Sequence, residues 1–258
     1  MNLTWLGTAG FRIETGDHAF LIDPYFTRNP ESSPVQNLRP DQLEPAGQIF
    51  ISHGHFDHLS DVPIAAEITG AIVYCDPVAA DSLMKKGLSP ERIHIVSQNG
   101  ADFNFGVYQA RAFYSRHVRF DVPLVLRTLA RVGTRFLDLR PTLTEYPAGQ
   151  VLSWRFTLEG RTMHHFGSAG ATPHELERLK KMETDILLLP LQGHTNICQI
   201  ALNYVRAMQP KLVIPHHHDD FFPPISQNVD ISPFISGVEK QYPNTKTKIL
   251  KINETVVL

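Results

Sequence analysis

The stretch HGHFDHLSD, residues 53–61, places three histidines and two aspartates within nine positions. One serine separates it from a preceding apolar run, IFI, that is typical of a buried strand. In an extended loop, His53 and His55 at a spacing of two point to the same side, so both imidazoles can reach one ion. Asp57 and His58 follow where the chain turns into a helix, and they can face a second ion close by. A polar surface loop is the alternative interpretation.

Imidazole nitrogen and carboxylate oxygen are ligands that zinc favours, and a catalytic zinc site leaves one position open for water. Such a site lowers the pKa of its water to about 7. The spacing therefore predicts a hydrolase with one or two Zn²⁺ ions, with Mn²⁺ or Fe as alternatives. We expect metal-bound hydroxide to attack an ester, lactone, amide or phosphoester bond of a small molecule. Asp57 is expected to be catalytic too, because a carboxylate beside the hydroxide can accept its proton.

The segments before and after this cluster predict how it is held. Alternating polar and apolar residues favour a meander of short strands at 3–6, 11–14 and 19–22. Strands and helices then alternate. The expected strands are 48–52, 71–75 and 92–96, and the expected helices are 60–69 and 77–86.

The second half of the chain repeats this change from meander to alternating elements. We expect a hairpin over 102–113, strands at 151–158 and 161–166, helices at 173–182 and 197–208, and strands in DILLLPL and KLVIP. This order predicts an α/β fold with four layers, an αββα sandwich of two mixed β-sheets flanked by helices.

Length and composition fit one domain over residues 1–258, with an insertion or lid at about 118–148. A formal net charge of −2 gives no global attraction to nucleic acid, so no nucleic-acid partner is expected. No apolar run approaches a membrane span, and the start lacks a basic segment before a long apolar one, so a cytoplasmic location is the default. Cys75 and Cys198 are expected to be buried thiols.

With H-x-H-x-D-H after a strand, the sequence resembles the metallo-β-lactamase-fold hydrolases. The opening, WLGTAGFRIETGDHAFLIDPY, is similar to the start of the branch that includes the ascorbate-phosphate lactonase-like enzymes. The resemblance covers nearly the full chain and weakens between about 118 and 150. It implies an αββα sandwich with metals at one edge of the two sheets, which agrees with the predicted layers, and it favours an acyl or lactone substrate.

The resemblance also implies further ligands. A third histidine for the first metal follows a strand in the middle of the chain, and AFYSRHV supplies His117. A late histidine for the second metal follows an apolar strand and a proline, and in KLVIPHHHDDFFPP the P-x-H spacing favours His217 over His216 and His218. The triplet could instead be solvated or form an oligomer contact. The implied ligand sets are His53, His55 and His117 for one ion, and Asp57, His58 and His217 for the other.

One departure from the family pattern concerns the bridging aspartate of a Gly-Asp-Thr sequence. This chain reads HHFGSAG, so Ser168 stands in that position. A neutral hydroxyl is a poor ligand and offsets none of the charge of two dications. Bridging by hydroxide alone, substitution by His164, His165 or His194, and a single tightly held ion are the open alternatives. A non-catalytic metal-binding scaffold is a further one.

Two groups outside the ligand sets are candidates for a role. His194, in LPLQGHTN between a buried strand and a helix, could stabilise an oxyanion or protonate a leaving group, or could merely cap the helix. Asp23, after the third strand, is expected to orient a ligand histidine.

Arg127, Arg131 and Arg135 recur at a spacing of four and would form one row along a helix. The row could meet an anionic substrate, although a solvated face is the alternative. A phosphodiesterase or nuclease acting on nucleic acid is the competing enzyme function, and the lack of a basic patch interleaved with aromatic residues counts against it. The expected partner is a small-molecule substrate, with a homo-oligomer also conceivable and no membrane.

Overall fold

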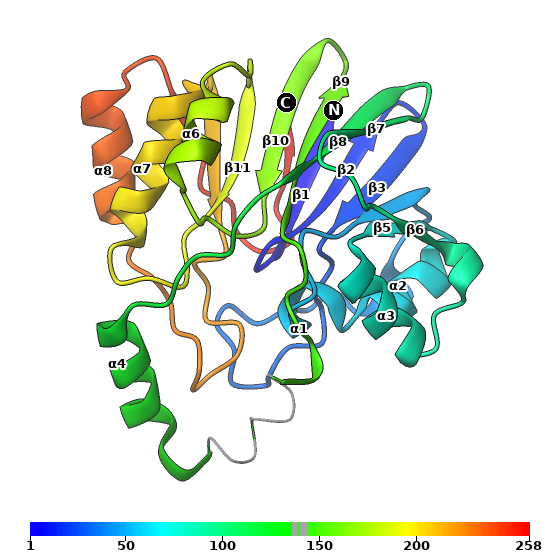
Figure 1. The fold of residues 1–258 in the computed structure, drawn as a ribbon, viewed down its shortest axis with the longest axis horizontal. Helices are drawn as coiled ribbons and strands as arrows, with labels where there is room; N and C mark the ends of the chain where they lie inside the picture. The colour runs from blue at the N-terminus through cyan, green and yellow to red at the C-terminus, as the bar shows by residue number, and fades with distance from the viewer. Residues whose placement is uncertain (136–138, 140–143) are drawn as a thin grey trace.

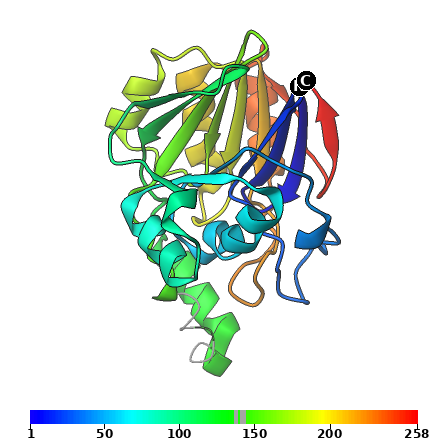
Figure 2. The same cartoon turned by 90° about the vertical axis from the view of Figure 1, so that its right-hand side faces the viewer.

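The computed structural model describes residues 1–135, 139 and 144–258. Two seven-stranded sheets pack face to face, and helices cover both outer faces (Figures 1 and 2). Each sheet mixes antiparallel and parallel pairs. The αββα sandwich predicted from the order of elements is confirmed.

The first sheet has the strand order β14-β1-β2-β3-β4-β5-β6. Its first four strands pair antiparallel, and β3 to β6 pair parallel. Its strands are β1 (Asn2–Gly7), β2 (Gly10–Thr15), β3 (His18–Ile22), β4 (Gln48–Phe50), β5 (Ile72–Cys75), β6 (Ile93–Ile95) and β14 (Thr255–Val257).

The second sheet has the order β13-β12-β11-β10-β9-β8-β7. Its first four strands are parallel, and β10 to β7 are antiparallel. Its strands are β7 (Ala101–Asn104), β8 (Tyr108–Tyr114), β9 (Leu152–Leu158), β10 (Arg161–Phe166), β11 (Ile186–Pro190), β12 (Leu212–His216) and β13 (Lys246–Thr247).

Aromatic side chains fill the space between the sheets. The ring of Phe20 stacks on that of Phe156 with centroids 4.7 Å apart, and the ring of Phe50 lies 4.8 Å from that of Trp154. All four side chains are fully buried. Such rings supply large apolar area and fix the spacing of the sheets, so the strand ends beyond them are held in register.

Helices cover the outer faces and lead into the edge of the sandwich. Figure 1 shows α2 and α3 beside the first sheet, with α6, α7 and α8 beside the second. The short α1 lies at the lower edge, and α4 stands away from both sheets. The helices are α1 (Phe56–Leu59), α2 (Val62–Thr69), α3 (Pro77–Lys85), α4 (Val122–Val132), α6 (Pro173–Leu179), α7 (Ile197–Met208) and α8 (Ser232–Gln241), with short 3-10 turns η1 (Pro40–Gln42), η2 (Pro90–Arg92) and η3 (Gly133–Arg135).

The expected arginine row is wrong in one respect. Arg127 and Arg131 lie on α4, but the helix ends at Val132, and Arg135 lies in η3 after Gly133. The guanidinium of Arg131 donates hydrogen bonds to the carbonyls of Pro224 and Ile225 and to Gln227. It therefore holds a loop of its own chain and is not presented to an anionic substrate.

Other expectations for this part of the chain fare differently. Cys75 is buried as expected, whereas the expectation is wrong for Cys198, which is partly exposed on α7 and whose Sγ lies 3.6 Å from the carbonyl oxygen of Asp230. Part of the expected insertion at 118–148 lies outside the described residues, namely 136–138 and 140–143. Among the helices that the structure describes, none is long and apolar enough to cross a membrane.

Candidate metal centre

The histidine cluster starts where β4 ends, between the two sheets. The backbone carbonyl of Ile51 accepts a hydrogen bond from Trp154 Nε1 at 3.0 Å, and that of Ser52 accepts one from Leu152 N at 2.7 Å. Both donors belong to β9 of the other sheet. The loop that begins at His53 is therefore anchored to both layers of the sandwich.

His53, His55 and His117 form the first group of possible ligands. One ring nitrogen from each lies within 4.8 Å of the others. His53 Nε2 faces His55 Nδ1 at 3.1 Å, and the ring centroid of His117 lies 5.1 Å and 4.7 Å from those of His53 and His55. The structure thus brings together the three histidines that the resemblance implies for one ion.

Asp57, His58 and His217 form the second group, and all three are buried. Oδ2 of Asp57 lies 3.5 Å from His58 Nε2 and 3.2 Å from His217 Nε2. The rings of His53 and His58 have centroids 4.0 Å apart, so the two groups are adjacent. α1 carries Asp57 and His58 within its single turn, while His217 arrives from the end of β12.

Hydrogen bonds to Asp23 fix the tautomers of two of these imidazoles. Asp23 is fully buried; its Oδ2 accepts from Ser52 Oγ at 2.5 Å and from His58 Nδ1 at 2.8 Å. Ser52 has one hydroxyl proton, which it donates to Asp23, so Ser52 Oγ accepts from His53 Nδ1 at 3.0 Å. In its neutral form each of these two imidazoles therefore carries the lone pair on Nε2, the atom that would bind a metal.

His117 is oriented in the same way by its own backbone. Its Nδ1 donates to the carbonyl of Val118 at 2.7 Å, which leaves Nε2 as the lone-pair atom. Burial lowers the pKa of His117 below its ordinary value of 6.5. The ring is therefore neutral at pH 7, as a metal ligand must be.

The pKa values of His53 and His55 also favour the neutral ring, whereas that of His58 shifts the other way. Burial, followed by repulsion from His58, lowers the pKa of His53 well below 6.5, and burial lowers that of His55 to about 4. Burial opposes ionisation of Asp57, but the nearby His58 and His217 outweigh it and lower the pKa of the carboxyl. Burial likewise opposes a charge on His58, whose pKa is nevertheless raised by Asp57 and Asp23.

The remaining histidines of the triplet lie elsewhere. His216 faces the interior, where its ring stacks on that of His165 with centroids 5.1 Å apart and planes 8° from parallel. His218 packs beside Trp5 at 5.3 Å. His217 leaves the strand with φ +55°, and its Nδ1 is buried without a partner in the described part of the chain. Backbone direction therefore separates His217 from its neighbours.

A small network holds the loop of His217. Its backbone N–H donates to the carbonyl of Thr8 at 2.8 Å, and Thr8 N donates to Asp219 Oδ2 at 3.0 Å. Arg28 Nη2 binds the same carboxylate oxygen at 2.6 Å, and both side chains are nearly inaccessible. Thr8, in the turn after β1, thus helps to position the second group, and no sequence motif indicated this role.

Two of the histidines proposed as substitutes for the bridging aspartate, His164 and His165, lie on β10, and neither belongs to the two ligand groups. His164 Nε2 lies 3.1 Å from Ser153 Oγ, and His165 Nε2 donates to the carbonyl of Ala9 at 3.2 Å. Ser168 is buried, and its Oγ accepts a hydrogen bond from Val118 N at 3.0 Å. The hydroxyl is therefore engaged by the loop of His117.

His194 lies on the loop before α7, close to the segment that follows His117. Its Nδ1 accepts from Asn196 N at 2.9 Å and lies 3.8 Å from Asp121 Oδ1. A Cβ on Gly193 would lie 2.5 Å from Val118, so the two loops are in contact. Because Nδ1 is an acceptor, the proton of a neutral His194 ring is on Nε2.

Gly54, between the first two histidines, is required by close packing. Its N–H donates to the carbonyl of Ala148 at 2.8 Å, and a Cβ there would lie 2.2 Å from the carbonyl oxygen of Pro147. A side chain at this position would force the histidine loop away from the 147–149 segment.

Aromatic rings border both groups. The ring of Phe120, which is 59% exposed, lies 5.6 Å from that of His117. The ring of Phe221 lies 5.0 Å from that of His217. Phe120 thus places exposed apolar surface beside His117, whereas Phe221 is buried against His217.

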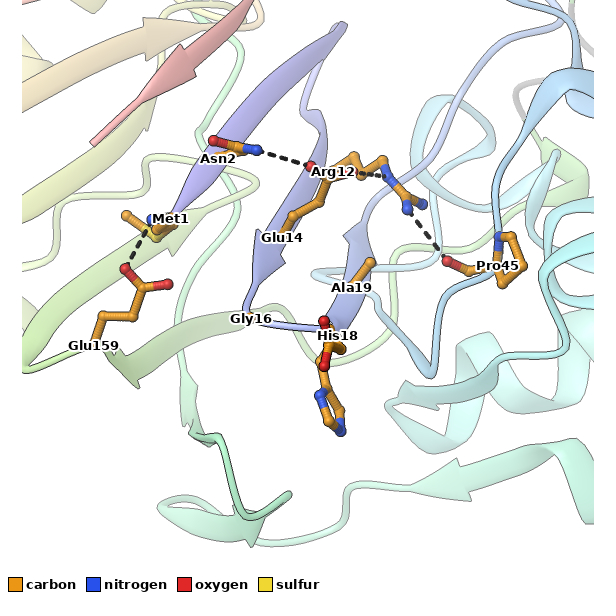
Figure 3. Close-up of a pocket in the computed structure, with 10 residues that line it drawn as sticks. Met1, Asn2, Arg12, Glu14, Gly16, His18, Ala19, Pro45 and Glu159 are labelled. Atoms are coloured by element: carbon orange, nitrogen blue, oxygen red, sulfur yellow. Dashed lines mark hydrogen bonds and ion pairs between the residues drawn. The ribbon is translucent and has the colours of Figure 1, made fainter.

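A polar hollow of about 320 Å³ lies at the other end of β3, near His18 (Figure 3). Two ion pairs lie in it: the amine of Met1 lies 2.8 Å from Glu159, and Arg12 Nε donates to Glu14 at 3.0 Å. It contains no cluster of free donors, so we attribute no chemistry to it.

The donor set fits divalent metal ions. Imidazole nitrogens converge, three of them on rings whose Nδ1 atoms are fixed by hydrogen bonds, and one ionised carboxylate is among them. Nitrogen and carboxylate ligands of this kind suit zinc, with iron or manganese as alternatives. His53, His55 and His117 would hold one ion, and Asp57, His58 and His217 a second.

Comparisons with known proteins agree with this chemistry. The model of the beta-lactamase superfamily domain matches residues 2–217. A UPF0173 metal-dependent hydrolase of Carboxydothermus hydrogenoformans is 31% identical over 221 residues, covering 85% of both chains. Another, from Aeropyrum pernix, is 31% identical over 261 residues, covering 98% of this chain and 96% of the relative. The solved structure of Igni18, a metallo hydrolase from Ignicoccus hospitalis, matches with a TM-score of 0.69 at 19% identity, covering 99% of this chain and 97% of that one.

Proposed function

The chain belongs to the beta-lactamase superfamily and within it to the UPF0173 metal-dependent hydrolases, and from this premise we propose that it hydrolyses acyl or lactone bonds of a small molecule with zinc. The observation that carries the proposal is the convergence of His53, His55 and His117 beside Asp57, His58 and His217. When bound, such ions lower the pKa of a water ligand to about 7 and so supply a nucleophile at neutral pH.

The chain's own residues divide the remaining work. Asp23 and Ser52 orient His58 and His53, so their Nε2 atoms need no reorganisation on binding an ion. The lowered pKa of Asp57 makes its carboxylate a good ligand and a weak base. We therefore assign Asp57 to holding the ion, and its carboxylate could orient a water ligand of that ion by accepting a hydrogen bond from it.

His194 is proposed to act on the substrate. Its Nε2–H is the donor left once Nδ1 accepts from Asn196, and an N–H can stabilise an oxyanion or protonate a leaving group. The exposed ring of Phe120 beside His117 favours an apolar acyl or aryl substituent. These features support the acyl and lactone preference suggested by the lactonase-like opening of the sequence.

The test is hydrolysis by metal-free protein reloaded with Zn²⁺, using aryl esters, lactones, and p-nitrophenyl mono- and diesters of phosphate. We expect turnover of esters or lactones, its loss in Asp57→Asn, and a lower kcat with little change in KM in His194→Ala. His164→Gln is the matched control, because His164 is a buried histidine outside both groups. Turnover of phosphodiesters alone would contradict the substrate class, and a fully active Asp57→Asn would contradict the site.

A further inference from the structure

Glu175 is a buried carboxylate that belongs to neither ligand group. It lies in the first turn of α6 and is 3% exposed. Both of its oxygens are engaged: Ser115 Oγ donates to Oε1 at 2.5 Å, and Tyr204 OH donates to Oε2 at 3.1 Å. Burial raises the pKa of Glu175, and the two hydroxyls oppose this rise. Burial of a carboxylate costs free energy unless hydrogen bonds compensate, and the groups that bond to Glu175 connect it to the rest of the site.

The first partner leads to His117. Ser115 follows the last residue of β8 and stands two positions before His117. Arg178, on the next turn of α6, donates from Nη2 to the carbonyl of Tyr114 at 3.0 Å. One helix therefore holds two successive residues at the point where the chain leaves the sheet toward the metal site.

The second partner leads to the loop after β10. The hydroxyl of Tyr204, on α7, accepts a hydrogen bond from Ala171 N at 2.8 Å while it donates to Glu175. A Cβ on Gly170 would lie 2.4 Å from the carbonyl oxygen of Arg116. The loop after β10 thus packs directly against the loop that carries His117, and the Glu175–Tyr204 pair ties both to helices.

We propose that Glu175, together with Tyr204, is a positioning residue for His117. Through Ser115 and the Ala171 loop it holds His117 where its Nε2 faces His53 and His55. The other group, Asp57, His58 and His217, is carried by α1 and the end of β12, and its hydrogen bonds run to Asp23 and Thr8, not to Glu175 or Tyr204. Loss of the hydrogen bonds of Glu175 and Tyr204 should therefore selectively weaken ion binding at the three-histidine group. The proposal depends on the proposed function only in that this group binds an ion.

The experiment titrates metal-free protein with Zn²⁺ against a chromophoric chelator and records the visible spectrum of the Co²⁺ form. His117→Ala and His217→Ala identify which transition belongs to which group. Glu175→Ala and Tyr204→Phe remove the hydrogen bonds that are proposed to position His117. Tyr108→Phe is the matched control, because Tyr108 is also a buried tyrosine whose hydroxyl binds one side chain, Gln48, but at the start of β8. Glu175→Gln tests rescue, since an amide can still accept from Tyr204 and donate to Ser115.

We expect Glu175→Ala and Tyr204→Phe to weaken the three-histidine transition by about 10- to 100-fold, the usual cost of losing a residue that supports a ligand. Their Co²⁺ spectra should change, while Glu175→Gln and Tyr108→Phe should match the wild type. Equal weakening at both groups, or an effect of Tyr108→Phe as large as that of Tyr204→Phe, would overturn the proposal in favour of general destabilisation. A wild-type chain that binds no ion would instead refute the proposed function.

Discussion

Ser168 accepts a hydrogen bond from the backbone N–H of Val118 at 3.0 Å, so the residue at the place of the family's bridging aspartate is tied to the loop of His117. Its hydroxyl neutralises no charge. Asp57 is consequently the one carboxylate among the six ligand candidates. Two dications at these groups would meet less negative charge than in a site with a bridging carboxylate, and their repulsion would be stronger.

Removing the hydroxyl of Ser168 should destabilise the fold. In Ser168→Ala the N–H of Val118 is left buried without an acceptor, which costs about 1–3 kcal/mol of unfolding free energy. Urea denaturation of the metal-free protein measures this change. Ser97→Ala, at an exposed position, is the control. A Ser168→Ala variant as stable as the control would mean that water replaces the hydroxyl.

A carboxylate at position 168 should increase the affinity for the more weakly bound ion. In Ser168→Asp a negative charge is added beside the loop of His117, and repulsion between two ions opposes only the second to bind, so the affinity for the second Zn²⁺ should rise while that for the first changes less. Calorimetric titration with Zn²⁺ resolves the two steps. If Ser168→Asp binds no tighter than the wild type, charge repulsion does not limit the second ion.

The two groups should fill in a definite order. The group of Asp57, His58 and His217 includes the carboxylate, so its ion is expected to bind first and to be the last removed by a chelator. Elemental analysis of protein dialysed against increasing chelator should show two ions per chain, then one. The last ion should remain in His117→Ala and vanish in His217→Ala, and the reverse pattern would assign the tight site to the three histidines.

Much of this arrangement was readable from sequence. Alternation located the strands on both sides of the histidine cluster, and the spacing of His53 and His55 placed both rings on one side of the loop. Helix α8, of ten residues, and the short strands β13 and β14 are not among the elements that the sequence predicts. β14 has three residues and forms by pairing with β1 at the opposite end of the chain, which no local pattern signals.

The supporting residues could not be predicted for a related reason. Ser168 meets the backbone of a residue 50 positions away, and Asp23 meets His58 across 35 positions. Such contacts depend on tertiary packing and leave no periodic trace. The choice of His217 over His216 rested on the family's P-x-H spacing, whereas in the structure it rests on backbone direction at the end of β12.

Gly54→Ala should disable the first group with little effect on the rest of the molecule. The added Cβ would lie 2.2 Å from the carbonyl of Pro147, so the loop between His53 and His55 must shift. Gly47→Ala is the matched control, because nothing lies within 4 Å of a Cβ at that position. We expect Zn²⁺ affinity of the three-histidine group to fall in Gly54→Ala alone. Unchanged affinity would show that the 147–149 segment yields more easily than the histidine loop.

Stability of the metal-free protein should fall as the pH is lowered, in part through His164. Burial lowers the pKa of this fully buried histidine well below 6.5, so the folded chain keeps it neutral while the unfolded chain protonates it. Because the unfolded state then binds more protons, the unfolding free energy is lost as the pH falls below 6.5, by up to about 1.4 kcal/mol per pH unit for one group. His165 and His216 shift in the same direction and add to the slope.

His164→Gln isolates the contribution of His164, because glutamine does not titrate and can still bond to Ser153. Urea denaturation in the presence of a chelator, repeated between about pH 7 and pH 5, should give a shallower loss of stability in the variant than in the wild type. The variant can be less stable at pH 7, since it loses the stacking of His164 on Phe166. The slope, not the absolute stability, is therefore the decisive quantity, and equal slopes would mean that His164 is protonated in the folded chain as readily as in the unfolded one.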